Sequence, residues 1–105
     1  MTGKSRKQQI QDMLADDPND PFLRYGLAME YVSEGNDSEA WRTLQGLLAV
    51  AADYVPAYLQ SGQILARLGR TAEARDIWSR GVAVARARGD QHAADEMQGF
   101  LAGGS

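Results

Sequence analysis

The single histidine comes closest of all residues in this sequence to a catalytic arrangement. His92 precedes Asp95 by three positions and Glu96 by four, so a carboxylate on the same helix face could orient its imidazole. A hydrolytic triad would also need a serine in a strained turn of the nucleophile-elbow type, and no serine stands in such a turn. We therefore expect His92 to be a surface or partly packed residue.

Three closely spaced aspartates are the best candidates for a metal site. Asp16, Asp17 and Asp20 lack the alternating carboxylates, central glycine and final glutamate of a calcium loop. The sequence contains no cysteine, which removes thiolate ligands and cysteine nucleophiles, and one histidine cannot form an imidazole cluster. We expect these aspartates to cap helices or face solvent, and we predict no metal, no cofactor and no enzymatic activity.

The glycines and the basic residues do not form recognised ligand-binding patterns. Gly62, Gly69 and Gly81 stand apart, without the spacing of a phosphate-binding loop, and are interpreted as packing and capping glycines. The basic residues lack the interleaved aromatic residues of nucleic-acid binders. The sequence therefore predicts no nucleic-acid partner.

Length and hydropathy indicate one small domain outside the membrane. The chain has 105 residues and a net charge of −3. Its longest apolar stretch, Leu47–Ala52, is six residues long, against about 18 for a membrane span. The basic start of the chain leads into no apolar secretory segment. We expect a cytoplasmic protein with no membrane partner.

The charges are unevenly distributed along the chain. Residues 12–53 carry a local charge of −7, whereas residues 67–88 carry +4 from six arginines and two acids. These charges either cover solvated helix faces or steer a partner, or a second copy, into place.

Proline and glycine divide the chain into segments whose apolar residues recur at helical spacing, which predicts an all-α fold with about six helices. The expected helices cover residues 5–16, 21–33, 36 or 37 to 50, 55–68, 71–88 and 91–102. Asp20 and Thr71 are expected to cap the second and fifth helices, and Asn36 with Glu39 has the form of a capping box. Gly35 is expected to end the second helix in the left-handed conformation.

A 34-residue internal repeat organises these helices. Gly35 and Gly69 are 34 residues apart, as are Leu44 and Trp78, which indicates that one antiparallel helical hairpin occurs twice in the sequence. Small residues are expected where the two helices of each hairpin approach closely. These small residues are Ala28 and Ala40 in the first hairpin and Gly62 and Ala74 in the second.

The repeat resembles the tetratricopeptide repeat (TPR) family, whose unit follows W-x2-L-G-x2-Y, then A-x3-F, then P. The first full unit matches this pattern through Leu27-Ala28-x2-Tyr31 with Ala40-x3-Leu44. The second matches it through Tyr58-x2-Ser61-Gly62-x2-Leu65 with Ala74-x3-Trp78. Four positions depart from the pattern: Arg24 stands where it has tryptophan, Ser61 where it has leucine, and Ala52 and Arg86 where it has proline.

The resemblance implies a TPR-like right-handed superhelical stack of antiparallel helix-turn-helix hairpins, forming a single domain over residues 1–105. Within it, residues 5–16 are the second helix of a truncated repeat, residues 21–54 and 55–88 are two full repeats, and residues 90–102 are a C-terminal capping helix. The capping helix departs from the repeat register, and Ala93, Met97 and Phe100 are expected on its packing face.

In this family one helix of each hairpin lines a concave groove that usually binds extended or helical peptides. On the helix over 21–33, one row of side chains adjoins the core-facing residues, giving an apolar arc of roughly 220° against the ~100° stripe that packing on one neighbour requires. The predicted groove residues on this helix and on the next one are Phe22, Tyr25, Met29, Val32, Leu59, Gln60, Gln63 and Arg67.

The leading hypothesis is a non-catalytic scaffold that binds an apolar peptide segment or helix in this groove, with a protein partner of unknown identity. The alternative is a self-associating homodimer whose groove or hairpin face is buried by a second copy, because the two oppositely charged halves suit an antiparallel pair. A third interpretation is that the apolar face is ordinary core covered by the first helix or by the end cap.

Overall fold

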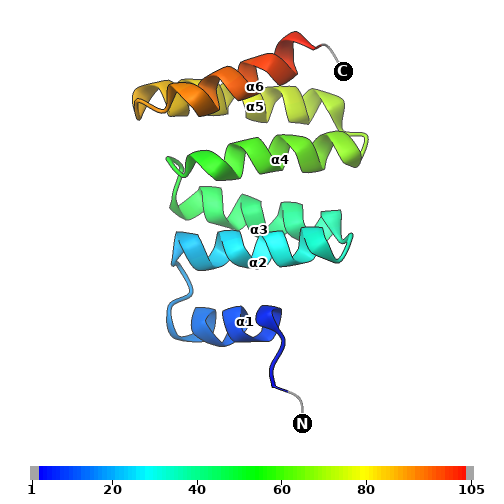
Figure 1. The fold of residues 1–105 in the computed structure, drawn as a ribbon, viewed down its shortest axis with the longest axis vertical. Helices are drawn as coiled ribbons and strands as arrows, with labels where there is room; N and C mark the ends of the chain where they lie inside the picture. The colour runs from blue at the N-terminus through cyan, green and yellow to red at the C-terminus, as the bar shows by residue number, and fades with distance from the viewer. Residues whose placement is uncertain (1–2, 104–105) are drawn as a thin grey trace. The chain divides into compact units, whose positions relative to one another are not determined.

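The computed structural model describes residues 3–103, and its secondary structure consists of six α-helices over those residues (Figure 1). The helices are α1 (Arg6–Asp16), α2 (Pro21–Ser33), α3 (Asp37–Val50), α4 (Val55–Arg67), α5 (Thr71–Ala87) and α6 (Gln91–Ala102). The all-α prediction is confirmed, and each helix agrees with its predicted bounds to within one residue. Residues 1–2 and 104–105 of the predicted domain lie outside the described residues.

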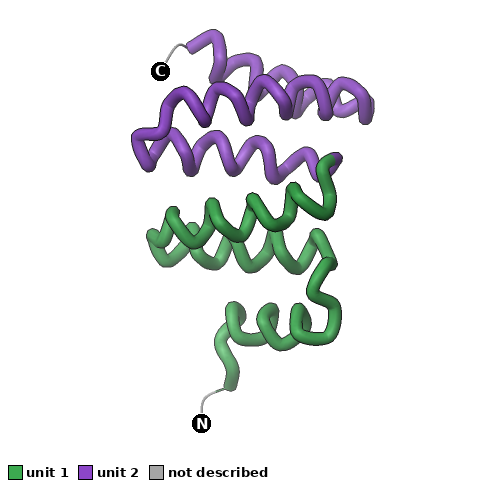
Figure 2. The backbone as a smooth tube through the Cα atoms, turned by 180° about the vertical axis from the view of Figure 1, so that it is seen from behind, with its two compact units in different colours: residues 1–52 green, residues 53–105 purple. Residues whose placement is uncertain are grey.

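The chain divides into two compact units (Figure 2). Unit 1 is residues 1–52 and contains α1, α2 and α3, whereas unit 2 is residues 53–105 and contains α4, α5 and α6. The division falls close to the predicted boundary between the two repeats at residues 54 and 55. Each unit is described by itself below.

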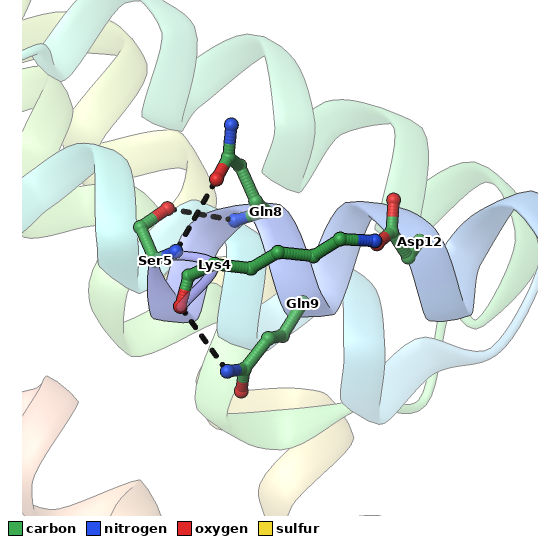
Figure 3. A network of polar contacts seen from close by, with 5 residues as sticks. All are labelled: Lys4, Ser5, Gln8, Gln9 and Asp12. Carbon is green, nitrogen blue, oxygen red and sulfur yellow. Dashed lines mark hydrogen bonds and ion pairs between the residues drawn. The ribbon is translucent and has the colours of Figure 1, made fainter. Parts of the chain in front are cut away.

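The first two helices of unit 1 begin with side-chain caps. The Oγ of Ser5 accepts a hydrogen bond from the backbone N–H of Gln8 at 3.1 Å, and the Gln8 side chain accepts one from the backbone N–H of Ser5 at 3.2 Å (Figure 3). This capping box was not predicted, although the sequence carries its Ser-x-x-Gln signature. The predicted cap of α2 is confirmed, because Asp20 Oδ1 accepts from the backbone N–H of Leu23 at 3.1 Å.

The predicted caps of α3 and α5 have different outcomes. Asn36 Oδ1 accepts from the backbone N–H of Glu39 at 3.3 Å, so Asn36 is confirmed as a cap. The prediction for Thr71 is wrong, because Thr71 is the first residue of α5 and Arg70 is its N-cap, without a side-chain capping bond. The Arg70 side chain instead donates two hydrogen bonds to Glu73, at 2.7 and 2.8 Å, and holds the pKa of that carboxyl below its usual value.

Three helices end at glycines in the left-handed conformation. Gly35, Gly69 and Gly89 have φ angles of 74°, 79° and 76°. A side chain is disfavoured there, which is why glycine ends α2, α4 and α5 and allows the chain to turn back. The predicted role of Gly35 is confirmed.

The α4–α5 hairpin of unit 2 closes around small residues. A Cβ atom at Gly62 would lie 2.1 Å from the indole Nε1 of Trp78, and Ala74 is buried. A Cβ atom at Gly81 would lie 2.5 Å from the Sδ of Met97 and 2.6 Å from the Cβ of Tyr58. The predicted packing role of Gly62 and Gly81 is therefore confirmed, because neither position has space for a side chain.

The helix α6 completes the core of unit 2. Met97 and Ala94 are fully buried, and the ring of Phe100 stacks on Trp78 with 5.0 Å between the ring centroids. The predicted packing residues Ala93 and Phe100 are half-buried and Met97 is fully buried. The packing face also includes Ala94, which was not predicted.

The core of unit 1 lies in the α2–α3 hairpin. Ala28 and Ala40 are fully buried at the predicted close approach, together with Leu44 and Leu47 of α3. The first helix contributes less, because Ile10 is its one buried residue among those described. The helix α1 is therefore attached to the hairpin by a small apolar contact, and its assignment to a truncated repeat stays a prediction.

Arg24 shows how unit 1 accommodates a departure from the family pattern. Its guanidinium lies against the backbone of α3, where a Cβ atom at Gly46 would lie 2.7 Å from Nη1. Its Nε donates a hydrogen bond to the carbonyl oxygen of Pro18 at 2.7 Å. The side chain thus ties the α1–α2 connection to the hairpin.

Candidate protein-binding face

The residues considered for chemistry lie on the surface. His92 is exposed on α6, as predicted, and Asp16 and Asp17 are exposed at the end of α1. Asp20 is half-buried and caps α2. Within residues 3–103, no group of three or more His, Cys, Asp or Glu side chains is placed to hold a metal ion.

The predicted binding row on α2 is partly accessible. The side chain of Phe22 is 73% exposed, while Tyr25, Met29 and Val32 are half-buried. Ala28 is the buried residue of this helix, so the row lies beside the side that packs into the hairpin. The interpretation that α1 covers this face as ordinary core fails at Phe22.

The predicted binding row on α4 belongs to unit 2. Leu59, Gln60 and Gln63 are half-buried, and Arg67 is exposed at the C-terminal end of the helix. The carbonyl oxygen of Leu59 accepts a hydrogen bond from the Trp78 indole N–H at 3.4 Å, so the start of this row is held by the hairpin core. This row has amide and cationic groups where the α2 row is apolar.

Ion pairs attach α1 to α2 along one side. Lys7 Nζ lies 2.9 Å from a carboxylate oxygen of Glu34 and 5.0 Å from the centre of the Tyr31 ring. Arg6 Nε lies 3.3 Å from Glu30. The hydrogen bond from Lys7 to Glu34 raises the pKa of Lys7 above its usual value. Charged contacts therefore supplement the single buried residue of α1.

A hollow of about 240 Å³ lies between α1 and α2 in unit 1. Ile10 and Met13 of α1 form one side, and Phe22, Leu23 and Gly26 of α2 form the other. Arg6 and Gln9 also line the hollow. Sequence reasoning missed it, although the absent side chain of Gly26 and the position of Met13 after Ile10 could have indicated a gap between the two helices.

Unit 2 has a more polar hollow at the start of α4. It has a volume of about 350 Å³ and is lined by Asp53, Tyr54, Val55, Pro56, Arg88 and Asp90. Arg88 Nη1 lies 2.8 Å from Asp53 Oδ2 across it, so an internal ion pair already uses its charges.

The described helices show no candidate membrane span, since none within residues 3–103 is both long and apolar enough to cross a bilayer. The cytoplasmic location expected from the sequence stays a prediction.

Antiparallel helical hairpins repeated at 34 residues, with an apolar row on the first helix, define a helical-repeat protein of the kind that mediates protein interactions. The chain is 32% identical over 92 residues to a TPR repeat-containing protein of Pseudomonas aeruginosa, and the match covers 88% of both chains. The chain therefore belongs to the tetratricopeptide repeat family. No family model matches the sequence.

Solved structures agree with this assignment. A tetratricopeptide repeat domain protein from Salinibacter ruber, determined in solution, is 38% identical with a TM-score of 0.76, over 80% of this chain and 85% of that one. A protein of Bordetella parapertussis is 30% identical with a TM-score of 0.81, over 94% of this chain and 86% of that one. These similarities confirm the predicted TPR-type fold.

Proposed function

We propose that this chain is a non-catalytic interaction module that binds an apolar peptide segment or helix through the predicted row on α2. TPR domains generally mediate protein interactions, which supports the general class. The observation that carries the proposal is the 73% exposed side chain of Phe22 beside the half-buried Tyr25, Met29 and Val32. An exposed aromatic residue that continues an apolar row is typical of a binding surface.

The side chains of the α2 row suit a partner of apolar chemistry. The row has no charged member, so a partner that buried ionised groups against it would lose their hydration without compensation. Met29 has a flexible, polarisable side chain that adapts to different apolar partners, and Tyr25 combines an apolar ring with one polar group. We therefore expect large aliphatic or aromatic side chains in the partner segment.

The α4 row adds a second, separately testable part of the proposal. Leu59, Gln60, Gln63 and Arg67 offer amide and cationic groups, which favour a partner with backbone carbonyls or an acidic residue to recognise. The contribution of this row stays a prediction, and Arg67→Gln tests it without changing α2.

The test is peptide selection followed by measurement of affinity. Peptides that bind the full chain are selected from an unbiased library, and their Kd is measured by isothermal titration calorimetry. Met29→Glu and Tyr25→Ala are expected to weaken binding at least about tenfold, a loss of roughly 1.4 kcal/mol, because each removes apolar contact area. The control is Ala83→Glu, which changes an exposed position on α5. Unchanged affinity in both α2 variants would overturn the proposal.

A further inference from the structure

We propose that unit 1 pairs with a second copy of this chain through an apolar surface formed by α1 and α2. This surface, which we call the α1–α2 patch, consists of Ile10, Met13, Phe22, Leu23 and Gly26 around the hollow of about 240 Å³. The inference goes beyond peptide binding and does not rest on it, because four of these five residues lie on α1 or at α2 positions outside the predicted row.

The patch places a projecting side chain directly beside a hollow. The side chain of Phe22 is 73% exposed and that of Met13 is 47% exposed, and both line the hollow from opposite helices. An apolar cavity of about 150 Å³ accommodates a benzene molecule, so this hollow has room for a phenylalanine ring. A twofold axis near Phe22 would let each copy insert its ring into the hollow of the other, which is the self-complementary geometry of a symmetric dimer.

The charges of α1 are arranged for an antiparallel copy. Lys4, Arg6 and Lys7 stand at its start, whereas Asp12 and Asp16 stand toward its end. This order opposes the helix macrodipole, which favours acids at the start and bases at the end. An antiparallel second α1 would bring its acidic end to the basic start of the first, at both ends of the pair.

Basic residues at the start of α1 already form ion pairs with acidic residues of the same chain. The Lys4 side chain extends along α1 and forms an ion pair with Asp12 (Figure 3). The side chain of Arg6 contacts Glu30 but is still 81% exposed, so a carboxylate from another molecule can reach it. The charges of both signs along α1, together with the ring and the hollow of the α1–α2 patch, favour a second copy over an unrelated partner.

The patch spans two short helices, so the dimer belongs to the class of weak interfaces with small buried area. Sedimentation equilibrium of the full chain from micromolar concentrations to about 1 mM is expected to show the average mass rise from one chain toward two. Phe22→Glu should raise the dissociation constant at least about tenfold. Val50→Glu is the matched control, because Val50 is a 49% exposed apolar residue of unit 1 outside the patch, and it should change the constant less than twofold.

A charge variant separates pairing from the stability of the chain. Asp16→Lys should raise the thermal unfolding midpoint, because a cation then stands at the end of α1, and should weaken dimerisation several-fold, because like charges then meet across the pair. A structural role alone would not move these two readouts in opposite directions. In a mixed sample of labelled and unlabelled chains, isotope-filtered NMR should show contacts between the Phe22 ring of one copy and the Ile10 methyl groups of the other.

Three results would overturn the inference: a single-chain mass at every concentration, a dimer that Phe22→Glu leaves unchanged, or pairing that requires a different protein. Met29→Glu, which lies outside the α1–α2 patch, should leave the dimer unchanged while it weakens peptide binding. The failure of this inference is thereby distinguished from the failure of the proposed peptide-binding function.

Discussion

The two units contain the same kind of helical hairpin but bury different amounts of apolar surface. Among residues 3–103, twelve of the 18 buried hydrophobic residues belong to unit 2, while all three exposed large hydrophobic residues, Met13, Phe22 and Val50, belong to unit 1. The terminal helices explain part of the difference, because α6 buries Met97 and Ala94 whereas α1 buries Ile10. A repeat pattern therefore specifies the hairpin, and the helix beside it decides how much apolar surface is left for a partner.

Positions 34 residues apart show how the two hairpins differ. Unit 2 has Tyr58 where unit 1 has Arg24, and Arg80 where unit 1 has Gly46. The Arg80 guanidinium lies over the Tyr58 ring, 5.9 Å from its centre, whereas the Arg24 guanidinium lies against Gly46. In unit 2 Tyr58 therefore fills the core of the hairpin, whereas in unit 1 Arg24 holds the α1–α2 connection through its hydrogen bond to Pro18.

The largest expected difference in the free energy of unfolding is between alanine variants of the methionines on the two terminal helices. Met97→Ala should lower the free energy of unfolding by about 3 kcal/mol, because the side chain is fully buried against Gly81 and leaves a cavity. Met13→Ala should lower it by less than about 1 kcal/mol, because that side chain is 47% exposed. Urea unfolding followed by circular dichroism measures both changes, and equal losses would show that α1 is packed as firmly as α6.

A smaller effect of opposite sign is expected at Ser61, the counterpart of Leu27 in unit 1. The Ser61 hydroxyl is fully buried and has no hydrogen-bond partner among the described residues. Ser61→Ala should raise the free energy of unfolding by about 1 kcal/mol, because it removes an unsatisfied polar group. The control Ser79→Ala changes an exposed serine of α5 and should gain only a few tenths of a kcal/mol from helix propensity, on the order of 0.3. Destabilisation by Ser61→Ala would show that the hydroxyl is satisfied in solution.

The smallest expected effect concerns the ion pair that attaches α1. The hydrogen bond to Glu34 raises the pKa of Lys7 above its unfolded-state value, near 10.5. The ion pair therefore contributes fully to folding stability below that value, and its contribution is lost as the pH rises through the higher folded-state pKa. The Ile10 methyl resonance should therefore shift between about pH 9 and pH 12 as α1 loosens. Lys7→Met should abolish this step, and a step that persists in the variant would assign it to another group.

The sequence predicts the features that depend on neighbouring residues and on the repeat. The helix bounds follow from local caps and glycines, and the buried small residues Ala28 and Gly62 follow from the 34-residue period. The burial of Ala94 was not predicted, because α6 departs from that period and the repeat cannot set its register. The hollow beside Phe22 was missed, because its size depends on how α1, which lies outside the two full repeats, is spaced from α2.

We propose that unit 1, through the α2 face, is the part of the molecule that binds a partner. An NMR titration of the full chain with a selected apolar peptide tests it most directly, because the backbone resonances report both units in one experiment. We expect chemical-shift changes that cluster at Tyr25, Met29 and their neighbours on α2, with the resonances of the buried face of α5 unchanged. Shifts confined to α5 and α6, with α2 unaffected at saturation, would contradict it.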